Sequence, residues 1–345
     1  MTTRRRFIAA GVALVAAGAF RGVAVAQPPR LRFADMHSHH GMIVGKRSGQ
    51  STRLSDDMRA NGLAVVAMKV ISDSPVLMFA SGRIYALPAE SRGQFRAFYE
   101  RTVAAVMARA QAEGIELVTE PAHVDRALAG QAPAVVLASE GADFLEGDLG
   151  YLQVAYAAGL RHLQVMHFRA NEIGDTATEK PLHGGLTAFG RDVIRECNRL
   201  GILVDVAHCN HGGIIQALET TKKPLIYSHG WVSPEEPSWD KRGSRAVHAP
   251  LAKAIAKEGG VVGLFPIQRS LERYASAMVQ LVDIVGNEHA GMGVDLDGLS
   301  RPAIATYHDL PALVHELGRL GMKESTIDKV LGGNYLRVLK HVLAA

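Results

Sequence analysis

Short apolar runs that end in a histidine or an acidic residue recur along this chain, and they constrain its fold more than any other feature. The runs end at His37 and His39, Glu140, His167, His208, His229 and Asp295. Most are rich in β-branched residues and are followed by glycine or polar residues, as buried parallel strands are. The carboxyl ends of parallel strands meet at one mouth of a (β/α)8 barrel, where such barrels keep their active sites. The pattern therefore predicts an α/β chain folded as a (β/α)8 TIM-type barrel, with a metal centre at its mouth.

Strand candidates are spaced along the chain, and helix-period segments separate most of them. The candidates are Leu31–His37, Leu63–Val70, Ala134–Glu140, Leu160–His167, Ile202–His208, Pro224–His229, Gly260–Pro266 and Ala290–Asp295. Phe95, Tyr99 and Val103 belong to one apolar stripe on a long helix after the second strand. Residues 71–89 in that connection look irregular, and an excursion of this kind usually shapes a substrate pocket. With a helical tail over Leu310–Ala345, residues 27–345 are predicted to form a single barrel domain.

The first 26 residues have the pattern of a bacterial export signal of the twin-arginine (Tat) type. Arg4-Arg5-Arg6 precedes a moderate apolar stretch, Ile8–Phe20, and Ala24-Val25-Ala26 supplies a small-x-small cleavage site. The stretch is shorter than the ~20 residues that span a bilayer, which argues against a membrane anchor. We therefore expect residues 1–26 to be a Tat signal peptide and residues 27–345 to be periplasmic or secreted, without a stable membrane span.

Removing that segment changes what the charge of the chain implies. The whole chain has 38 Lys and Arg residues and 34 Asp and Glu residues, but four of the arginines and none of the acids lie within residues 1–26. Residues 27–345 therefore hold 34 basic and 34 acidic residues. The basic character belongs to the signal segment, and it gives no support for nucleic-acid binding.

The strand-end residues have the chemistry of a site for two cations. Zinc and similar ions take imidazole and carboxylate ligands. His37 and His39 alternate with one residue on a strand, so their side chains share a face and can hold one ion. Glu140 can bridge two ions, and His208 and His229, from the fifth and sixth strands, can hold the second. The sequence therefore predicts two divalent metal ions per chain, with Zn²⁺ the favoured ion.

Longer motifs surround these residues. They are Ser139–Gly141, Gly184–Arg191, Asn198–His208, Lys223–His229, Gly293–Gly298 and Gly332–Arg337. With them the chain resembles the renal (membrane) dipeptidase family of zinc metallopeptidases, in the amidohydrolase superfamily. The resemblance covers nearly all of residues 27–345 and is strongest from Glu140 onward. It implies a barrel of the metal-dependent hydrolase kind and a binuclear zinc dipeptidase, which cleaves dipeptides with a metal-bridging hydroxide.

The resemblance also implies ligand roles. Glu140 corresponds to the bridging carboxylate, and His208 and His229 correspond to the ligands of the second metal. The chain departs from the family at two positions that bear on the first metal and on substrate choice. His39 stands where the family's first motif has an aspartate, and Lys69 closes the second strand where the family usually has an uncharged residue.

Three further residues acquire roles in substrate binding and catalysis from the resemblance. His167 is similar to the histidine that contacts the substrate's carbonyl oxygen, and Arg245 to the arginine that binds the terminal carboxylate of the dipeptide. Asp295 is similar to the acid on the eighth strand that accepts a proton from water and passes it on, with Asp297 as the alternative.

Other functions stay open from the sequence alone. Related amidohydrolases use the same kind of centre on N-acyl amino acids, lactones or β-lactam-like amides, and the departures at His39 and Lys69 keep this alternative open. A metal-dependent binding protein without catalysis would have lost the bridge or the base, but Glu140 and Asp295 are both present. A serine hydrolase would need a G-x-S-x-G turn, which these motifs do not form. The sequence leaves open which dipeptides are preferred and whether the chain forms a homodimer.

Overall fold

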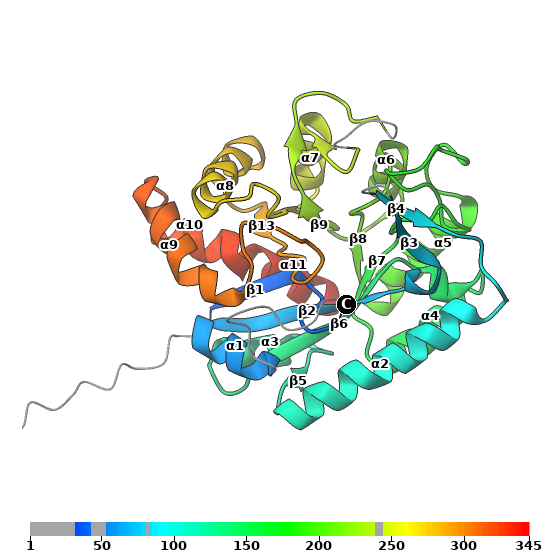
Figure 1. Ribbon diagram of the computed structural model, residues 1–345, viewed down its shortest axis with the longest axis horizontal. Helices are drawn as coiled ribbons and strands as arrows, with labels where there is room; N and C mark the ends of the chain where they lie inside the picture. Colours follow the sequence, from blue (N-terminus) through cyan, green and yellow to red (C-terminus); the bar gives the residue numbers. More distant parts are fainter. Residues whose placement is uncertain (1–31, 43–52, 81–82, 239–243, 345) are drawn as a thin grey trace, which may run out of the picture.

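The computed structural model describes residues 32–42, 53–80, 83–238 and 244–344. The predicted signal peptide, residues 1–26, lies outside the described residues. Parallel strands form a nearly closed barrel, which Figure 1 shows at the centre of a ring of helices. In sheet order the strands are β1 (Phe33–Ser38), β2 (Leu63–Ile71), β6 (Ala134–Glu140), β7 (His162–Gln164), β8 (Leu203–Asp205), β9 (Ile226–Gly230), β12 (Val261–Leu264) and β13 (Ala290–Met292). This order follows the predicted strands one by one and confirms the TIM-type barrel.

The barrel closes between its first and last strands through the segment that follows β13. Ser38 and Leu296 form an isolated parallel bridge. The backbone N–H of Asp295 donates to the His37 carbonyl at 2.8 Å, and the N–H of His39 donates to the Leu296 carbonyl at 3.0 Å. These bonds bring Asp295 beside the end of β1.

The helices alternate with the strands and cover the outside of the barrel (Figure 1). They are α1 (Leu54–Asn61), α2 (Gln94–Glu113), α3 (Pro121–Leu128), α4 (Tyr151–Ala157), α5 (Ala188–Leu200), α6 (His211–Thr220), α7 (Ala249–Lys257), α8 (Leu271–Val285), α9 (Leu310–Arg319), α10 (Glu324–Asp328) and α11 (Asn334–Leu343). Local chemistry sets their ends. In α5, the Thr187 hydroxyl accepts from the N–H of Gly190 at 3.0 Å, and the helix stops at Gly201, whose φ of 78° suits glycine. The predicted apolar stripe lies on α2, and α9, α10 and α11 lie within the predicted helical tail, whose last residue, Ala345, is outside the described residues.

The connection from β2 to α2 differs from the prediction of irregular chain. It contains an antiparallel hairpin of β3 (Leu77–Ala80) and β4 (Arg83–Ala86), in which Phe79 pairs with Ile84. Aromatic and β-branched residues favour this pairing. Each strand is four residues long, which is too short for a period-2 pattern to stand out from its surroundings. A second small sheet pairs β10 (Val232–Ser233) with β11 (Val247–His248), and β5 (Glu116–Leu117) adds to the edge of β6.

The barrel interior is filled in layers. At the end opposite the mouth, α11 inserts Tyr335 and Leu339 into the apolar cluster that contains Val136 and Ile226. A buried polar layer of Lys69, His162, Gln164 and Asp205 lies between this cluster and the mouth. The side chain of Lys69 therefore belongs to the framework below the mouth and does not line the mouth cavity.

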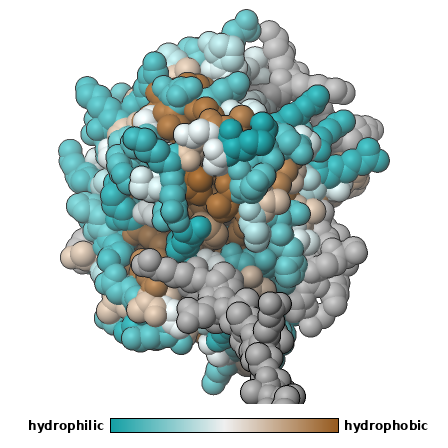
Figure 2. All heavy atoms as spheres, turned by 90° about the vertical axis from the view of Figure 1, so that its left-hand side faces the viewer, coloured by the Kyte–Doolittle hydropathy of each residue, from teal (hydrophilic) through white to brown (hydrophobic). Residues whose placement is uncertain are grey.

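Within the described residues, no helix combines the length and apolar character needed to cross a membrane. Hydrophilic residues cover most of the face shown in Figure 2, and hydrophobic residues gather in a hollow near its centre.

Candidate metal centre

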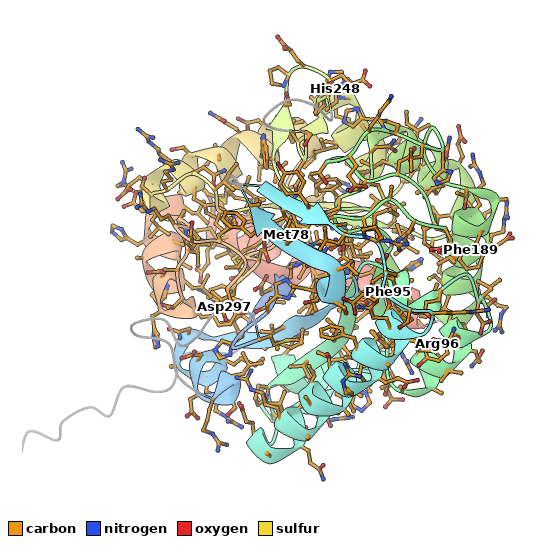
Figure 3. All side chains as sticks on the ribbon, turned by 45° about the vertical axis from the view of Figure 1, so that its right-hand side comes forward. Met78, Phe95, Arg96, Phe189, His248 and Asp297 are labelled. Atoms are coloured by element: carbon orange, nitrogen blue, oxygen red, sulfur yellow. The ribbon has the colours of Figure 1, made fainter. Side chains whose placement is uncertain are left out.

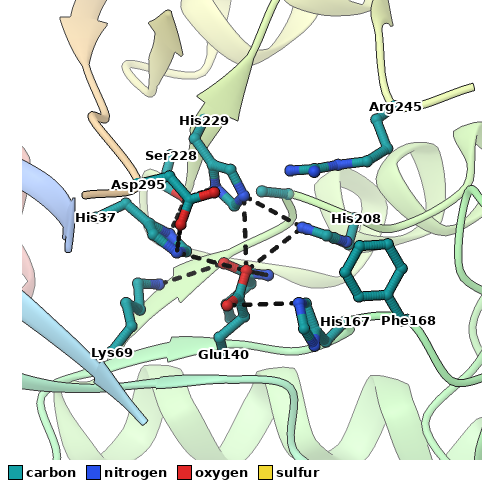
Figure 4. A network of polar contacts seen from close by, with 12 residues as sticks. His37, Lys69, Glu140, His167, Phe168, His208, Ser228, His229, Arg245 and Asp295 are labelled. Atoms are coloured by element: carbon teal, nitrogen blue, oxygen red, sulfur yellow. Dashed lines mark hydrogen bonds and ion pairs between the residues drawn. The ribbon is translucent and has the colours of Figure 1, made fainter. Parts of the chain in front are cut away.

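The predicted strand-end residues converge at the mouth of the barrel (Figure 4). His37 lies within β1 and His39 directly follows it, while Glu140 is the last residue of β6 and His229 lies within β9. His167, His208 and Asp295 lie in the loops that follow β7, β8 and β13. All of these residues are buried, so the fold gathers imidazole and carboxylate groups in a place largely closed to solvent.

One half of this cluster joins β1 to the loop after β13. The Nε2 atom of His39 lies 3.1 Å from Glu140 Oε2 and 3.2 Å from Asp295 Oδ1. The Nε2 atom of His37 lies 3.4 Å from Glu140 Oε1 and 3.6 Å from Asp295 Oδ1. Ligand atoms of His37, His39 and Asp295 all lie within 4.8 Å of one another, a spacing that can hold one metal ion.

The other half is also built around Glu140, and it shares both carboxylate oxygens with the first half. The Oε1 atom of Glu140 lies 3.3 Å from His208 Nε2 and 3.5 Å from His229 Nε2, and these two nitrogens are 3.1 Å apart. The Nε2 atom of His167 lies 3.4 Å from Glu140 Oε2. Glu140 thus stands between both groups of histidines, as a bridging carboxylate would. Glu140, His167 and His208 also meet the spacing for an ion, so the geometry permits His167 as a ligand as well as a substrate contact.

Hydrogen bonds on the far side of the rings aim these imidazoles at the cluster. The Nδ1 atom of His39 lies 2.9 Å from the carbonyl oxygen of Lys69, which can only accept, so Nδ1 donates and Nε2 faces the site. The hydroxyl of Ser228 lies 3.3 Å from His37 Nδ1 and 2.9 Å from His229 Nδ1. Because its oxygen can accept from both rings, Ser228 couples the orientation of histidines on two strands.

Asp73 fixes His167 in the same way, although it is not among the site residues predicted from the sequence. Its Oδ1 atom lies 2.6 Å from His167 Nδ1, and its Oδ2 atom accepts from the backbone N–H of Phe168 at 3.1 Å. Burial opposes a charged imidazole, but Asp73 and Glu140 outweigh it and raise the pKa of His167. Asp73 lies two residues past the end of β2, and this position after a barrel strand is the sequence signal that it shares with the predicted site residues.

The electrostatics of the site fit a cation. Burial alone would raise the pKa of Glu140, but His167, His37 and His208 hold it well below its usual range. Burial disfavours the charged form of His39, yet hydrogen bonds with Asp295 and Glu140 raise its pKa to about 10. Burial lowers the pKa of His208 to about 3. Positive charge between the carboxylates of Glu140 and Asp295 would therefore be stabilised. His208 supplies a neutral imidazole, which is the form that binds metals.

Of the two candidate acids after β13, the structure brings Asp295 to the cluster. Asp297 instead accepts from the backbone N–H of Gly41 at 2.6 Å. A Cβ atom at Gly298 would lie 2.3 Å from Asp295 Oδ1, so glycine there leaves room for the carboxylate. Asp295 and His208 have φ angles of 49° and 69°, in the left-handed region that side chains rarely adopt. Such strain is often concentrated at functional sites.

Arg245 faces the cluster across a cavity of about 520 Å³ at the mouth (Figure 4). Its carbonyl accepts from the Tyr227 hydroxyl at 2.6 Å, and its guanidinium carbon lies 4.9 Å from the centre of the Phe265 ring and 5.9 Å from that of Phe168. Among the described residues, its buried Nε and Nη2 atoms have no hydrogen-bond partner. Buried donors of this kind need an acceptor, and an anionic ligand in the cavity would provide one.

The fold and this cluster define a TIM-type barrel with a candidate metal centre at its mouth. The family model of the membrane dipeptidases (peptidase family M19) matches residues 83–345. The chain therefore belongs to the membrane dipeptidase family, which confirms the resemblance found in its motifs. The match begins after His37 and His39, where the chain also departs from the family's first motif.

Known relatives agree with this assignment. Dipeptidase 3 of Rattus norvegicus is 30% identical over 246 residues, which is 66% of this chain and 48% of the relative. Dipeptidase aclJ of Aspergillus oryzae is 30% identical over 220 residues, which is 60% of this chain and 51% of the relative. The chain thus spans about half the length of these two relatives. A metallopeptidase from Rhodobacter sphaeroides, liganded with a phosphinate mimic of the dipeptide L-Ala-D-Ala, has the same fold. Its TM-score is 0.77 at 22% identity, over 91% of this chain and 99% of that one.

Proposed function

We propose that this protein is a binuclear metal-dependent dipeptidase that hydrolyses the peptide bond of dipeptides. One observation carries the proposal. Across the cavity at the mouth, a cluster of buried imidazoles and carboxylates faces the guanidinium of Arg245, whose Nε and Nη2 donors lack a partner among the described residues. The dipeptidase names of the relatives and the dipeptide mimic in the Rhodobacter structure support the same activity.

The residues of the cluster would hold the metal ions. His37 and His39 would bind one ion, His208 and His229 the other, and Glu140 would bridge them. When bound, the ions, Zn²⁺ above all, would polarise the peptide carbonyl and activate the attacking water. The mixture of imidazole and carboxylate donors fits zinc.

The remaining site residues would act directly on the substrate. Asp295 would accept the proton of the attacking water and return it to the leaving amine. His167, held by Asp73, would donate a hydrogen bond to the carbonyl oxygen as negative charge develops there. Arg245 would pair with the terminal carboxylate through two parallel N–H donors. Because the guanidinium lies at a fixed distance from the cluster, this arrangement favours dipeptides over longer chains.

The test combines metal content with a change at Arg245. The purified chain should contain two divalent ions, and chelation should abolish dipeptide hydrolysis. Arg245→Ala should lower kcat/KM for a dipeptide, and the fall should correspond to a loss of about 2–5 kcal/mol in binding free energy. The loss should largely disappear with the C-terminally amidated dipeptide. Arg245→Lys is the matched control, because it keeps the charge but loses the planar pair of donors.

Two results would contradict this function. The first is full activity after exhaustive chelation with metal shown to be absent. The second is an equal loss in Arg245→Ala on the free and the amidated substrate, which would mean that Arg245 does not recognise the carboxylate.

We also propose that the chain is exported through the twin-arginine pathway. The support is in the sequence, where Arg4-Arg5-Arg6 precedes a moderate apolar stretch and the small-residue site Ala24-Val25-Ala26.

A further inference from the structure

The mouth cavity has two unlike kinds of lining. One is polar and comprises the imidazole–carboxylate cluster and Arg245. Apolar side chains also line the cavity: Met42, Ile71, Leu77, Ile84, Phe98 and Leu299, here called the apolar wall, while the rings of Phe168 and Phe265 lie beside Arg245. Ser74 and Thr102 contribute uncharged polar groups to the cavity. A pocket of this composition binds an apolar group by removing its surface from water.

The β3–β4 hairpin presents one of its faces to this cavity. Side chains alternate along a strand, and cross-strand partners share a face, so the pair Phe79 and Ile84 lies on the same side as Leu77. Leu77 and Ile84 line the cavity, which identifies this side as its inner face. Met78 and Tyr85 pair on the other side and do not line the cavity. Figure 3 shows Met78 on the hairpin in front of the barrel.

The hairpin is joined directly to the catalytic side of the cavity. The backbone N–H of Leu87 donates to the Val76 carbonyl at 2.8 Å, which closes the base of the hairpin. The N–H of Val76 in turn donates to the carbonyl of Asp73 at 3.0 Å, and the Asp73 side chain holds His167. The hairpin part of the apolar wall is therefore linked through Asp73 to His167, the residue proposed to contact the substrate's carbonyl oxygen.

The charges in the cavity limit what can lie against this wall. Among the described residues that line it, the acids are Glu140 and Asp295. Both face the imidazoles of His37 and His39 at 3.1–3.6 Å. The described part of the wall thus offers no separate carboxylate to pair with an ammonium group, whereas it offers several aliphatic side chains and one aromatic ring to an apolar group.

We propose that the acyl half of the substrate is large and apolar and that the inner face of the hairpin, through Leu77 and Ile84, selects it. This inference rests on the proposed function, because Arg245 must hold the carboxylate for the acyl half to reach the apolar wall. The apolar group is either the N-terminal side chain of a dipeptide or the acyl chain of an N-acyl amino acid. Both present the same chemistry to the wall, and they differ in whether an ammonium accompanies it.

The test measures kcat/KM over two series that share a C-terminal alanine. The first series is glycylalanine, leucylalanine, phenylalanylalanine and glutamylalanine, and the second is N-acetylalanine, N-hexanoylalanine and N-phenylacetylalanine. We expect a rise of at least about 10-fold from glycyl to leucyl or phenylalanyl, since even one methylene in an apolar pocket can contribute about 10-fold. The glutamyl compound should be the poorest dipeptide. The relative rates of N-hexanoylalanine and leucylalanine show which of the two sources the site prefers.

Variants on the two faces of the hairpin separate selection from stability. The double variant Leu77→Ala with Ile84→Ala should lose roughly 10-fold in kcat/KM for phenylalanylalanine and stay within about 2-fold for glycylalanine. Met78→Ala, on the outer face of the same hairpin, is the matched control and should change neither. Thermal unfolding of each variant verifies that the fold is kept.

A flat profile across both series, or an equal loss with glycylalanine in the double variant, would overturn the inference while leaving the dipeptidase proposal intact. If no member of either series is hydrolysed, the proposed function fails instead. Calorimetric binding of phenylalanylalanine and glycylalanine to wild type and the double variant then decides the subsite. Equal affinities for the two compounds would overturn it, and a preference for phenylalanylalanine that the double variant loses would support it.

Discussion

Lys69 Nζ lies 2.8 Å from Asp205 Oδ2 inside the barrel, and neither side chain is exposed to solvent. The second oxygen of Asp205 accepts from the backbone N–H groups of Ala207 and Ser228, each at 3.0 Å. The pair therefore ties β2 to the ends of β8 and β9, where His208 and His229 are carried. Lys69, where the chain departs from the family pattern, is thus part of the framework that carries these two histidines.

Removing one partner of this pair should destabilise the fold. Lys69→Met leaves the Asp205 carboxylate buried without its cation, which costs about 3–5 kcal/mol of unfolding free energy. The double variant Lys69→Met with Asp205→Asn removes both charges and keeps an amide oxygen for the two N–H groups, so it should recover part of the loss. Urea unfolding in the presence of a chelator measures both. A loss below about 1 kcal/mol in Lys69→Met would mean that the pair contributes little.

Asp73→Asn should slow catalysis without removing metal. The aspartate holds Nδ1 of His167 at 2.6 Å, and the loss of such an outer partner lowers activity by roughly 10–100-fold. If His167 contacts the substrate, kcat should fall while the metal content stays at the wild-type value. If metal is lost together with activity, His167 is a ligand, as its spacing to Glu140 and His208 permits.

The residues of the metal cluster could be predicted from the sequence more fully than the residues that hold them in place. Each histidine and acid of the cluster ends an apolar run, and this local pattern is visible in the sequence. The barrel and the residues that converge at its mouth could therefore be predicted together. Lys69 and Asp205 are far apart in sequence and meet only across the barrel, so no local sequence pattern predicts that they pair. The four-residue strands of the β3–β4 hairpin are too short to show a period. Arg245, in a loop, was found only through the family resemblance.

The stability of the fold should depend on pH through Asp143. Burial and the charge of Asp73 raise the pKa of this carboxyl from a usual value of 3.8, Arg169 and Asn171 oppose the change, and the resulting pKa is about 6. Between these values the folded state binds the proton more tightly than the unfolded state. The stabilisation from this group is therefore full below about pH 4 and is lost as the pH rises through about 6.

Asp143→Asn removes that titration and provides the test. From pH 4 to pH 7, the stability of wild type relative to the variant should decline by about 1–3 kcal/mol. Comparing the two proteins by urea unfolding cancels the titration of the other groups. Parallel pH profiles would show that Asp143 ionises in the folded protein as it does in the unfolded chain.

Export should depend on the arginine cluster near the N-terminus. The triple change Arg4→Lys, Arg5→Lys and Arg6→Lys keeps the charge but removes the twin arginine that the pathway requires. The precursor should then accumulate in the cytoplasm, as cell fractionation and the size of the chain would show. Arg21→Lys, beyond the apolar stretch, is the control and should be exported normally. Normal delivery of the triple variant would assign export to the general secretory route.

His39 is the position where a change of charge should alter both metal choice and pH dependence. Its Nδ1 donates to the Lys69 carbonyl, so its Nε2 faces Glu140 and Asp295, where a metal ion could replace its proton. Zinc favours imidazole, whereas manganese and magnesium favour carboxylates. His39→Asp should therefore keep two metal ions and bind manganese more readily relative to zinc. His39→Asn is the matched control, because asparagine has nearly the same shape as aspartate but carries no charge.

The same substitution places a third carboxylate beside Glu140 and Asp295. Added negative charge raises the pKa of ionising groups around it, so the acid limb of the pH–rate profile should move upward by about 1 unit in His39→Asp. In His39→Asn the limb should move much less, because no charge is added. Metal analysis and the profiles are measured on the same preparations of wild type, His39→Asp, His39→Asn and His39→Ala. If metal content and the acid limb are unchanged in all three variants, His39 is not a ligand, and the first ion is bound by His37, Glu140 and Asp295 or does not bind at all.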